Sequence, residues 1–144
     1  MYLFQVDIQP RLSDFDLYGH LNNTHYVSYT EVAMYNVLVY ELGFDHTQYG
    51  AITRHMSFDF DKPIRFGVPV AIQTKIIQMA NSIISVEHQF VSASNPEKVF
   101  ATAKRTMVLV SLADGKPAAI PESVLKTYEA KLSANADQAI SAVA

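Results

Sequence analysis

Hydrophobic and polar residues alternate from the first positions of the chain. Tyr2, Phe4, Val6 and Ile8 are separated by single residues that are mostly polar. This period of two is typical of a half-buried β-strand. Pro10 and the polar residues after it either end this strand or restrict it to the edge of a sheet.

Residues 24–42 have the pattern of one long helix, because apolar side chains recur there with few polar breaks. Asn22 or Asn23 is suited to cap the first turn, and Gly43 is placed to end the helix in a left-handed conformation. Because the helix is apolar on most sides, we expect other structure to wrap around it.

After Gly50 the period of two returns and persists through most of the remaining chain. Residues 55–60 alternate, and Lys62 and Pro63 interrupt the pattern. Three longer strands are predicted at 70–79, 83–92 and 99–112. The connections between them are short enough for antiparallel hairpins.

The order of elements predicts an α+β fold in which a curled antiparallel sheet wraps around a long central helix. Pro121 is placed to open a short helix whose apolar stripe extends to Leu132. Residues 133–144 are small and polar, and we expect them to form a flexible tail. The prediction is therefore one domain over residues 1–132.

Composition narrows the classes of function. The 144 residues carry a net charge of −3, which gives no electrostatic footprint for nucleic acid. Cysteine is absent, which excludes disulfides, thiolate catalysis and cysteine-ligated zinc. Hydrophobic residues make up 49% of the chain, which suits either a subunit interface or a large monomeric core.

The sequence also predicts a cytoplasmic protein that does not enter a membrane. The N-terminus reads as a strand and lacks the basic region of a signal peptide. The long helix carries Glu31, Asn36 and Glu41 within its apolar pattern, which indicates a buried helix and not a membrane span.

Polar side chains are concentrated in residues 14–26, between the first strand and the long helix. A calcium loop is excluded because its twelfth position is His25, where a bidentate Glu is required. His20 and His25 are five residues apart, which does not suit zinc on one helix face, so no metal is expected. Asp14 and Asp16 could form a glycosidase pair, but the chain has no Trp for a sugar platform.

What remains is Asp16, four residues before His20, in a loop that leads into a helix N-terminus. Unpaired N–H groups and the helix dipole suit an oxygen that becomes negative during attack on a carbonyl. A carboxylate beside them can act as a nucleophile or as a general base for water. The alternative stays open that Asp16 only caps a turn and Asn23 only caps the helix.

This stretch carries a family resemblance. Residues 11–26 read RLSDFDLYGHLNNTHY, and they resemble the hotdog-fold acyl-CoA thioesterases of the 4-hydroxybenzoyl-CoA thioesterase-like family. The resemblance covers residues 2 to about 121. It implies hydrolysis of an acyl-CoA, or of an acyl carrier protein thioester, with coenzyme A only as part of the substrate. It also implies homodimers or homotetramers with sites at the subunit interface.

The resemblance assigns roles to single residues. It implies that Asp16 is the catalytic carboxylate, and a change at Asp14 is expected to be far milder. It implies that the backbone N–H of Asn23 polarises the thioester carbonyl and that His20 orients the site or assists proton transfer. Tyr18 stands where plant acyl carrier protein thioesterases carry an Asn, and we count it as a substrate contact.

The resemblance is incomplete at the expected phosphate contacts. The turn at residues 79–82 lacks the basic cluster that some relatives use for coenzyme A. Lys62 and Arg65 are therefore the candidates for coenzyme A binding, with Lys104 and Arg105 as further possibilities. Solvated surface charge is the alternative for each.

Two rival functions stay open at this stage. One is a hotdog enoyl-thioester hydratase or dehydratase, although the spacer between Asp16 and His20 lacks the Asn usual there. The other is a non-catalytic module that binds acyl thioesters.

Overall fold

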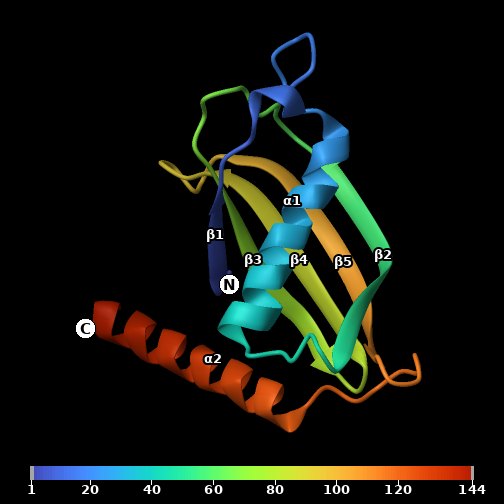
Figure 1. The fold of residues 1–144 in the computed structure, drawn as a ribbon. Helices are drawn as coiled ribbons and strands as arrows, with labels where there is room; N and C mark the ends of the chain where they lie inside the picture. Colours follow the sequence, from blue (N-terminus) through green and yellow to red (C-terminus); the bar gives the residue numbers. More distant parts are fainter. Residues whose placement is uncertain (1, 144) are drawn as a thin grey trace.

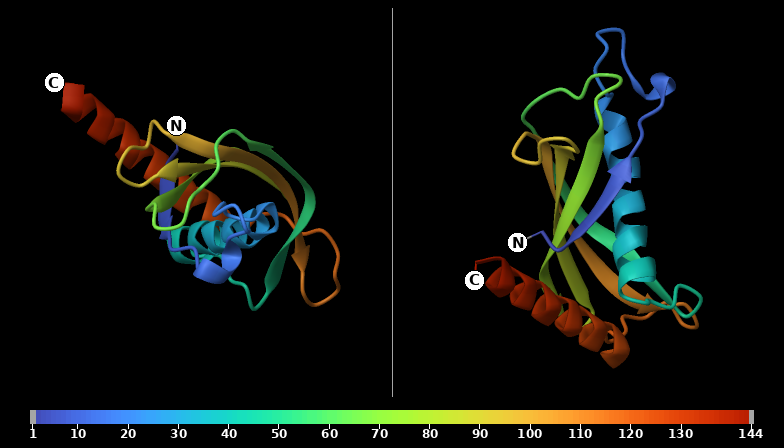
Figure 2. Two further views of the ribbon diagram at one scale, coloured as in Figure 1. Left: turned by 90° about the horizontal axis from the view of Figure 1, so that it is seen from above. Right: turned by 90° about the vertical axis from the view of Figure 1, so that its left-hand side faces the viewer.

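The structure is a computed structural model that describes residues 2–143. Its strands form one antiparallel five-stranded sheet in the order β1-β3-β4-β5-β2. The sheet curls around helix α1, as Figures 1 and 2 show. This arrangement confirms the predicted α+β class and the hotdog architecture. The strands are β1 (Phe4–Ile8), β2 (Tyr49–Phe60), β3 (Val70–Ala80), β4 (Ile83–Ser92) and β5 (Val99–Ser111).

The long helix is continuous but changes its winding. α1 (Asn23–Tyr35) runs directly into a wider π-helical segment, η2 (Asn36–Glu41). The Asn22 side chain caps α1 by accepting the N–H of Thr24. Gly43 follows the last turn with a φ of 69°, a left-handed conformation that favours glycine. Both predicted helix signals are confirmed, and a π-helical turn often marks a functional site.

The sheet covers only one side of this helix. Met34 and Val37 are buried in the core between helix and sheet, whereas Val32 and Tyr35 are each 48% exposed and Tyr40 is 74% exposed. The expectation that other structure wraps the helix on most sides is therefore wrong for the single chain. The exposed apolar side chains are available for contact with another chain.

The edge strand β2 provides a second such surface. Among the described residues it pairs only with β5, so its outer edge presents unpaired backbone groups. Ile52 on this strand is 55% exposed and Phe60 is 45% exposed. An edge of this length is usually covered or paired in a stable protein.

The last helix is longer than the sequence indicated. α2 (Glu122–Val143) buries Val124 against the core and then projects beyond the sheet, as Figure 1 shows. Residues 133–143, expected to form a flexible tail after a domain ending at residue 132, are helical here. Residue 144 lies outside the described residues. Helices in the described part are all too short or too polar to cross a membrane, and the cytoplasmic location stays a prediction.

Candidate functional site

Asp16 organises the loop that precedes α1. Its carboxylate Oδ1 accepts the backbone N–H groups of Tyr18, at 2.9 Å, and His20, at 3.1 Å. Its own N–H donates to the His20 carbonyl at 2.9 Å. Gly19, with a φ of 73°, provides the left-handed residue that the tight loop requires. The Asp16 side chain is exposed, so it closes the turn and still faces solvent.

Asp14 is the buried carboxylate of the pair. Its side chain is 2% exposed and accepts hydrogen bonds from the Tyr29 hydroxyl and, at 3.1 Å, from the Arg11 N–H. The Tyr29 hydrogen bond is the main reason that the pKa of Asp14 lies below its usual value. Burial, followed by the bond to Asp14, raises the pKa of Tyr29 to about 12. Asp14 therefore anchors the loop to α1, which makes it unsuitable as the neutral control that the sequence indicated.

We expect Asp14→Asn to lower the free energy of unfolding by about 2 kcal/mol at pH 7, because a buried acceptor of several hydrogen bonds loses its charge. The pKa of Asp14 is lower in the folded than in the unfolded state. Its contribution is therefore complete above the unfolded pKa near 4 and is lost as pH falls through the folded value. Urea unfolding of both proteins at pH 7 and pH 3 measures this. A difference that stays unchanged in acid would contradict it.

The loop is attached to the turn that follows β2. The Leu21 N–H donates to the Ile64 carbonyl at 2.8 Å, and His20 and Arg65 form a β-bridge. The Lys62 N–H donates to the Phe100 carbonyl at 3.0 Å. The structure thus brings Asp16, His20, Lys62 and Arg65 to one end of the sheet.

One further cation at this end was missed by sequence reasoning. Lys98, in the β4–β5 connection, places its Nζ 5.3 Å from the centre of the Phe100 ring. Phe100 is also the backbone partner of Lys62. Only the strand pairing brings Lys98 close to Lys62, so no local sequence pattern could have predicted that Lys98 lies at this end of the sheet. The side chain of Arg105 is only 1% exposed, so the prediction that Arg105 contacts phosphate at the surface is wrong. Lys104 is exposed.

The start of α1 leaves one donor available. The Asn22 side chain accepts the Thr24 N–H at 3.0 Å and its carbonyl accepts the His25 N–H at 3.0 Å. Within residues 2–143 no hydrogen bond uses the N–H of Asn23, the first residue of the helix. The helix cap is therefore Asn22, and the Asn23 N–H points into the region where the helix dipole favours negative charge.

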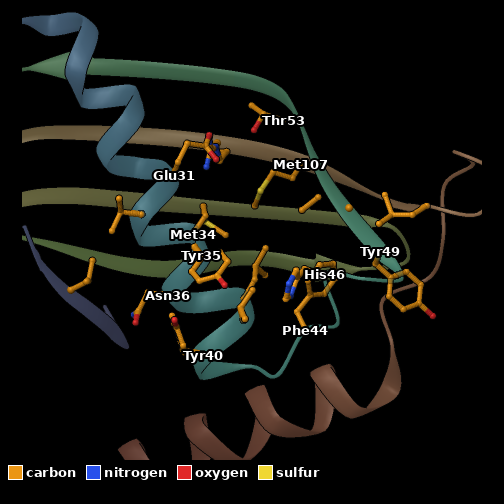
Figure 3. A pocket seen from close by; sticks show the side chains of 18 residues that line it. Glu31, Met34, Tyr35, Asn36, Tyr40, Phe44, His46, Tyr49, Thr53 and Met107 are labelled. Carbon is orange, nitrogen blue, oxygen red and sulfur yellow. The ribbon is translucent and has the colours of Figure 1, made fainter.

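A cavity of about 700 Å³ opens along the C-terminal half of the helical segment formed by α1 and η2, as Figure 3 shows. It lies between the segment formed by α1 and η2 and the strands β2 and β5, and mostly apolar and aromatic side chains line it. Arg105, a further possibility for coenzyme A binding, lines this cavity, whereas the other residues predicted for the site do not. The lining residues are Val6, Glu31, Val32, Met34, Tyr35, Asn36, Leu38, Val39, Tyr40, Phe44, His46, Tyr49, Gly50, Ala51, Thr53, Arg105, Met107 and Leu112.

The two ends of the cavity differ in chemistry. Glu31 and Thr53 lie at one end in Figure 3, and Phe44, His46 and Tyr49 lie toward the other. Arg105 reaches the first end from β5, where it forms an ion pair with Glu31. A volume of this size accommodates a small organic group whose surface is mostly apolar.

Comparison with known proteins identifies the family. The sequence profile of the thioesterase-like superfamily matches residues 10–127. The chain therefore belongs to this superfamily, and by class it is a thioester hydrolase, as the sequence predicted. No curated protein sequence matches the chain.

Solved structures share the fold. A protein from Pseudomonas aeruginosa is 24% identical with a TM-score of 0.82, and the match covers 90% of this chain and 91% of that one. A thioesterase from Thermus thermophilus, complexed with coenzyme A and zinc, is 23% identical with a TM-score of 0.75 and coverages of 90% and 94%. A 1,4-dihydroxy-2-naphthoyl-CoA thioesterase from Synechocystis is 18% identical with a TM-score of 0.74 and coverages of 86% and 93%.

Proposed function

We propose that the protein hydrolyses an acyl-CoA to the free acid and coenzyme A, with Asp16 as the catalytic carboxylate. The observation that carries this proposal is the junction before α1. A carboxylate held by two backbone N–H groups stands in the loop that ends at the unused N–H of Asn23. The bound coenzyme A of the Thermus thioesterase and the CoA ester named for the Synechocystis enzyme support coenzyme A as the carrier.

The chemistry follows from this arrangement. Asp16 removes a proton from water, or attacks the thioester carbonyl itself and forms an anhydride that water then cleaves. In either route the carbonyl oxygen becomes negative, and the Asn23 N–H with the helix dipole stabilises it. The carbon–sulfur bond breaks, the acid is released, and the thiolate takes a proton, for which His20 is the proposed donor.

The carrier is proposed to bind on the same end of the sheet. Lys62, Arg65 and Lys98 supply positive charge there, which suits the phosphate groups of coenzyme A. Tyr18, 80% exposed at the tip of the loop, is the proposed contact for the rest of the carrier.

The acyl group requires a second copy of the chain. The cavity uses the start of β2, from Tyr49 to Thr53, whereas the Asp16 loop is attached just beyond the end of β2 at Ile64. If two β2 edges pair antiparallel around a two-fold axis, the loop of each copy lies beside the cavity of the other. We infer a homodimer, alone or within a homotetramer, in which Asp16 acts on an acyl group held in the partner's cavity.

This assembly predicts complementation between two defective variants. Asp16→Asn removes the carboxylate, and Thr53→Trp, at an exposed position, fills the cavity. After the two are unfolded and refolded together, random pairing leaves one intact site in each mixed dimer, so about a quarter of wild-type activity should return.

Sedimentation provides the control, because each variant alone should remain a dimer with little activity. Folded dimers that recover nothing on mixing would show that each subunit uses its own cavity. A monomer with full activity would contradict both the assembly and the shared site.

A thiol-release assay with a panel of acyl-CoA substrates tests the reaction itself. Hydrolysis should release free thiol, whereas a hydratase would add water to an enoyl-CoA without releasing thiol. A binding module would do neither. The same acyl groups on an acyl carrier protein show which carrier is preferred.

A further inference from the structure

A second cavity, of about 440 Å³, lies at the end of the sheet that carries the Asp16 loop. The end of β1, the segment between β2 and β3, and the β4–β5 connection border it, and Figure 1 shows these three parts at one end of the molecule. Most of the lining is apolar, and among the described residues that line it only Asp7 carries a charge. The wall includes Asp7, Pro10, Phe15, Phe66, Pro69 and Ala93.

Phe66 gives this cavity an aromatic surface that the chain itself leaves uncovered. Its side chain is 56% exposed. The ring of Phe15, the residue before Asp16, meets the Phe66 ring at 88° with the ring centres 5.3 Å apart. This T-shaped contact holds the Phe66 ring in place without covering it. A flat aromatic ligand can stack on such a ring, and nucleobases do so with little regard to sequence because every base has a π-face.

Charges of opposite sign lie on different sides of the cavity. Asp7, exposed on β1, can only accept hydrogen bonds when ionised, so it favours a ligand edge that carries N–H donors. Arg65 directly precedes Phe66 in the chain, and Lys98 lies in the same connection as Ala93. These two cations suit phosphate groups. The arrangement therefore fits an aromatic ring with an amino group on one side and phosphates on the other.

We propose that this cavity binds the adenine ring of coenzyme A, with the base stacked on Phe66 and its exocyclic amino group donating a hydrogen bond to Asp7. This rests on the proposed function and specifies how the carrier is recognised. The phosphates then face Arg65 and Lys98, and the pantetheine arm leads back to the thioester at Asp16. An acyl carrier protein presents the same arm without a base, so the cavity favours coenzyme A as the carrier.

Binding of the nucleotide alone tests the site directly. Isothermal titration calorimetry compares adenosine 3′,5′-bisphosphate with the purine analogue in which hydrogen replaces the amino group. We expect the adenine nucleotide to bind about tenfold more tightly, because the analogue leaves the Asp7 carboxylate without its donor. In Asp7→Ala the ratio of the two affinities should fall to about one. Equal affinities in the wild type, or no measurable binding, would overturn the adenine site.

Steady-state kinetics test whether the cavity serves the reaction. Phe66→Ala should raise KM for an acyl-CoA about tenfold with little change in kcat, because stacking on the base is the same in the ground state and the transition state. The same acyl group on pantetheine, which has no nucleotide, should show a much smaller change. Phe66→Tyr keeps the ring and should resemble the wild type. Leu12→Ala is the matched control, because Leu12 is an apolar residue in the preceding loop that is 70% exposed and does not line the cavity.

The possible failures separate this site from the proposed function. Equal KM values for acyl-CoA and acyl-pantetheine would overturn the adenine site and leave the thioesterase function in place. An unchanged KM for acyl-CoA in folded Phe66→Ala would do the same. Absence of hydrolysis of both thioesters would overturn the proposed function, and the calorimetric comparison would still decide whether the cavity binds adenine.

Discussion

Asp16→Asn is expected to lower kcat by at least about a hundredfold while substrate binding changes little. The amide keeps the size of the side chain and an oxygen that can accept the Tyr18 and His20 N–H groups. It removes the charge that attacks the carbonyl or activates water. The Asn23 N–H and the helix dipole remain, so a small residual rate should persist.

The control for this variant must reproduce the turn without the chemistry. Asp114→Asn does so, because the Asp114 Oδ1 accepts the Lys116 N–H at 3.0 Å in an exposed turn before α2. Asp14→Asn does not, because Asp14 is buried beneath the loop. Steady-state kinetics should be compared after circular dichroism shows wild-type folding. Folded Asp16→Asn within about threefold of wild type would reduce Asp16 to a turn cap.

The second large effect is acid destabilisation through His88. This residue is fully buried on β4, opposite Thr74, whose Oγ1 lies 2.8 Å from the His88 Nδ1. Burial lowers the pKa of His88 from 6.5 to about 4. Between these two values the unfolded state binds the proton and the folded state does not, so stability is lost as pH falls.

Each pH unit in that interval costs about 1.4 kcal/mol, so His88 alone should remove about 3 kcal/mol between pH 7 and pH 4. Urea unfolding of the wild type and His88→Leu across this range isolates the effect, because other titrating groups are common to both. The variant should show a flatter decline. Parallel stability profiles for the two proteins would show that His88 does not titrate in this way.

Local sequence patterns determined most of the secondary structure. The period of two predicted residues 83–92 as a strand, and β4 (Ile83–Ser92) has those bounds. The helix cap at Asn22 and the helix end at Gly43 could be predicted from the sequence, because each depends only on residues within about one helical turn. The Asp16 loop was also found from the sequence, because its hydrogen bonds join residues no more than four positions apart.

The same local reading failed where periodicity ended. The local pattern predicted that the last helix ends near Leu132, because small and polar residues follow. In the structure these residues continue α2 to Val143. The sequence also predicted that other structure wraps around the long helix, because the helix is apolar on most sides. A hydrophobic pattern gives the apolar positions of a helix but not how much of that surface the same chain covers.

Tertiary structure alone decided which residues meet across the fold. Asp14 and Asp16 are alike in sequence, and only the packing of Tyr29 against Asp14 made one an anchor and left the other exposed. Glu31 and Arg105 are far apart in the chain, and the sheet register brings them to one cavity wall. The physical reason is that periodicity and capping depend on neighbours within a few residues, whereas burial, pairing of charges and cavities depend on contacts that form only when distant segments pack together.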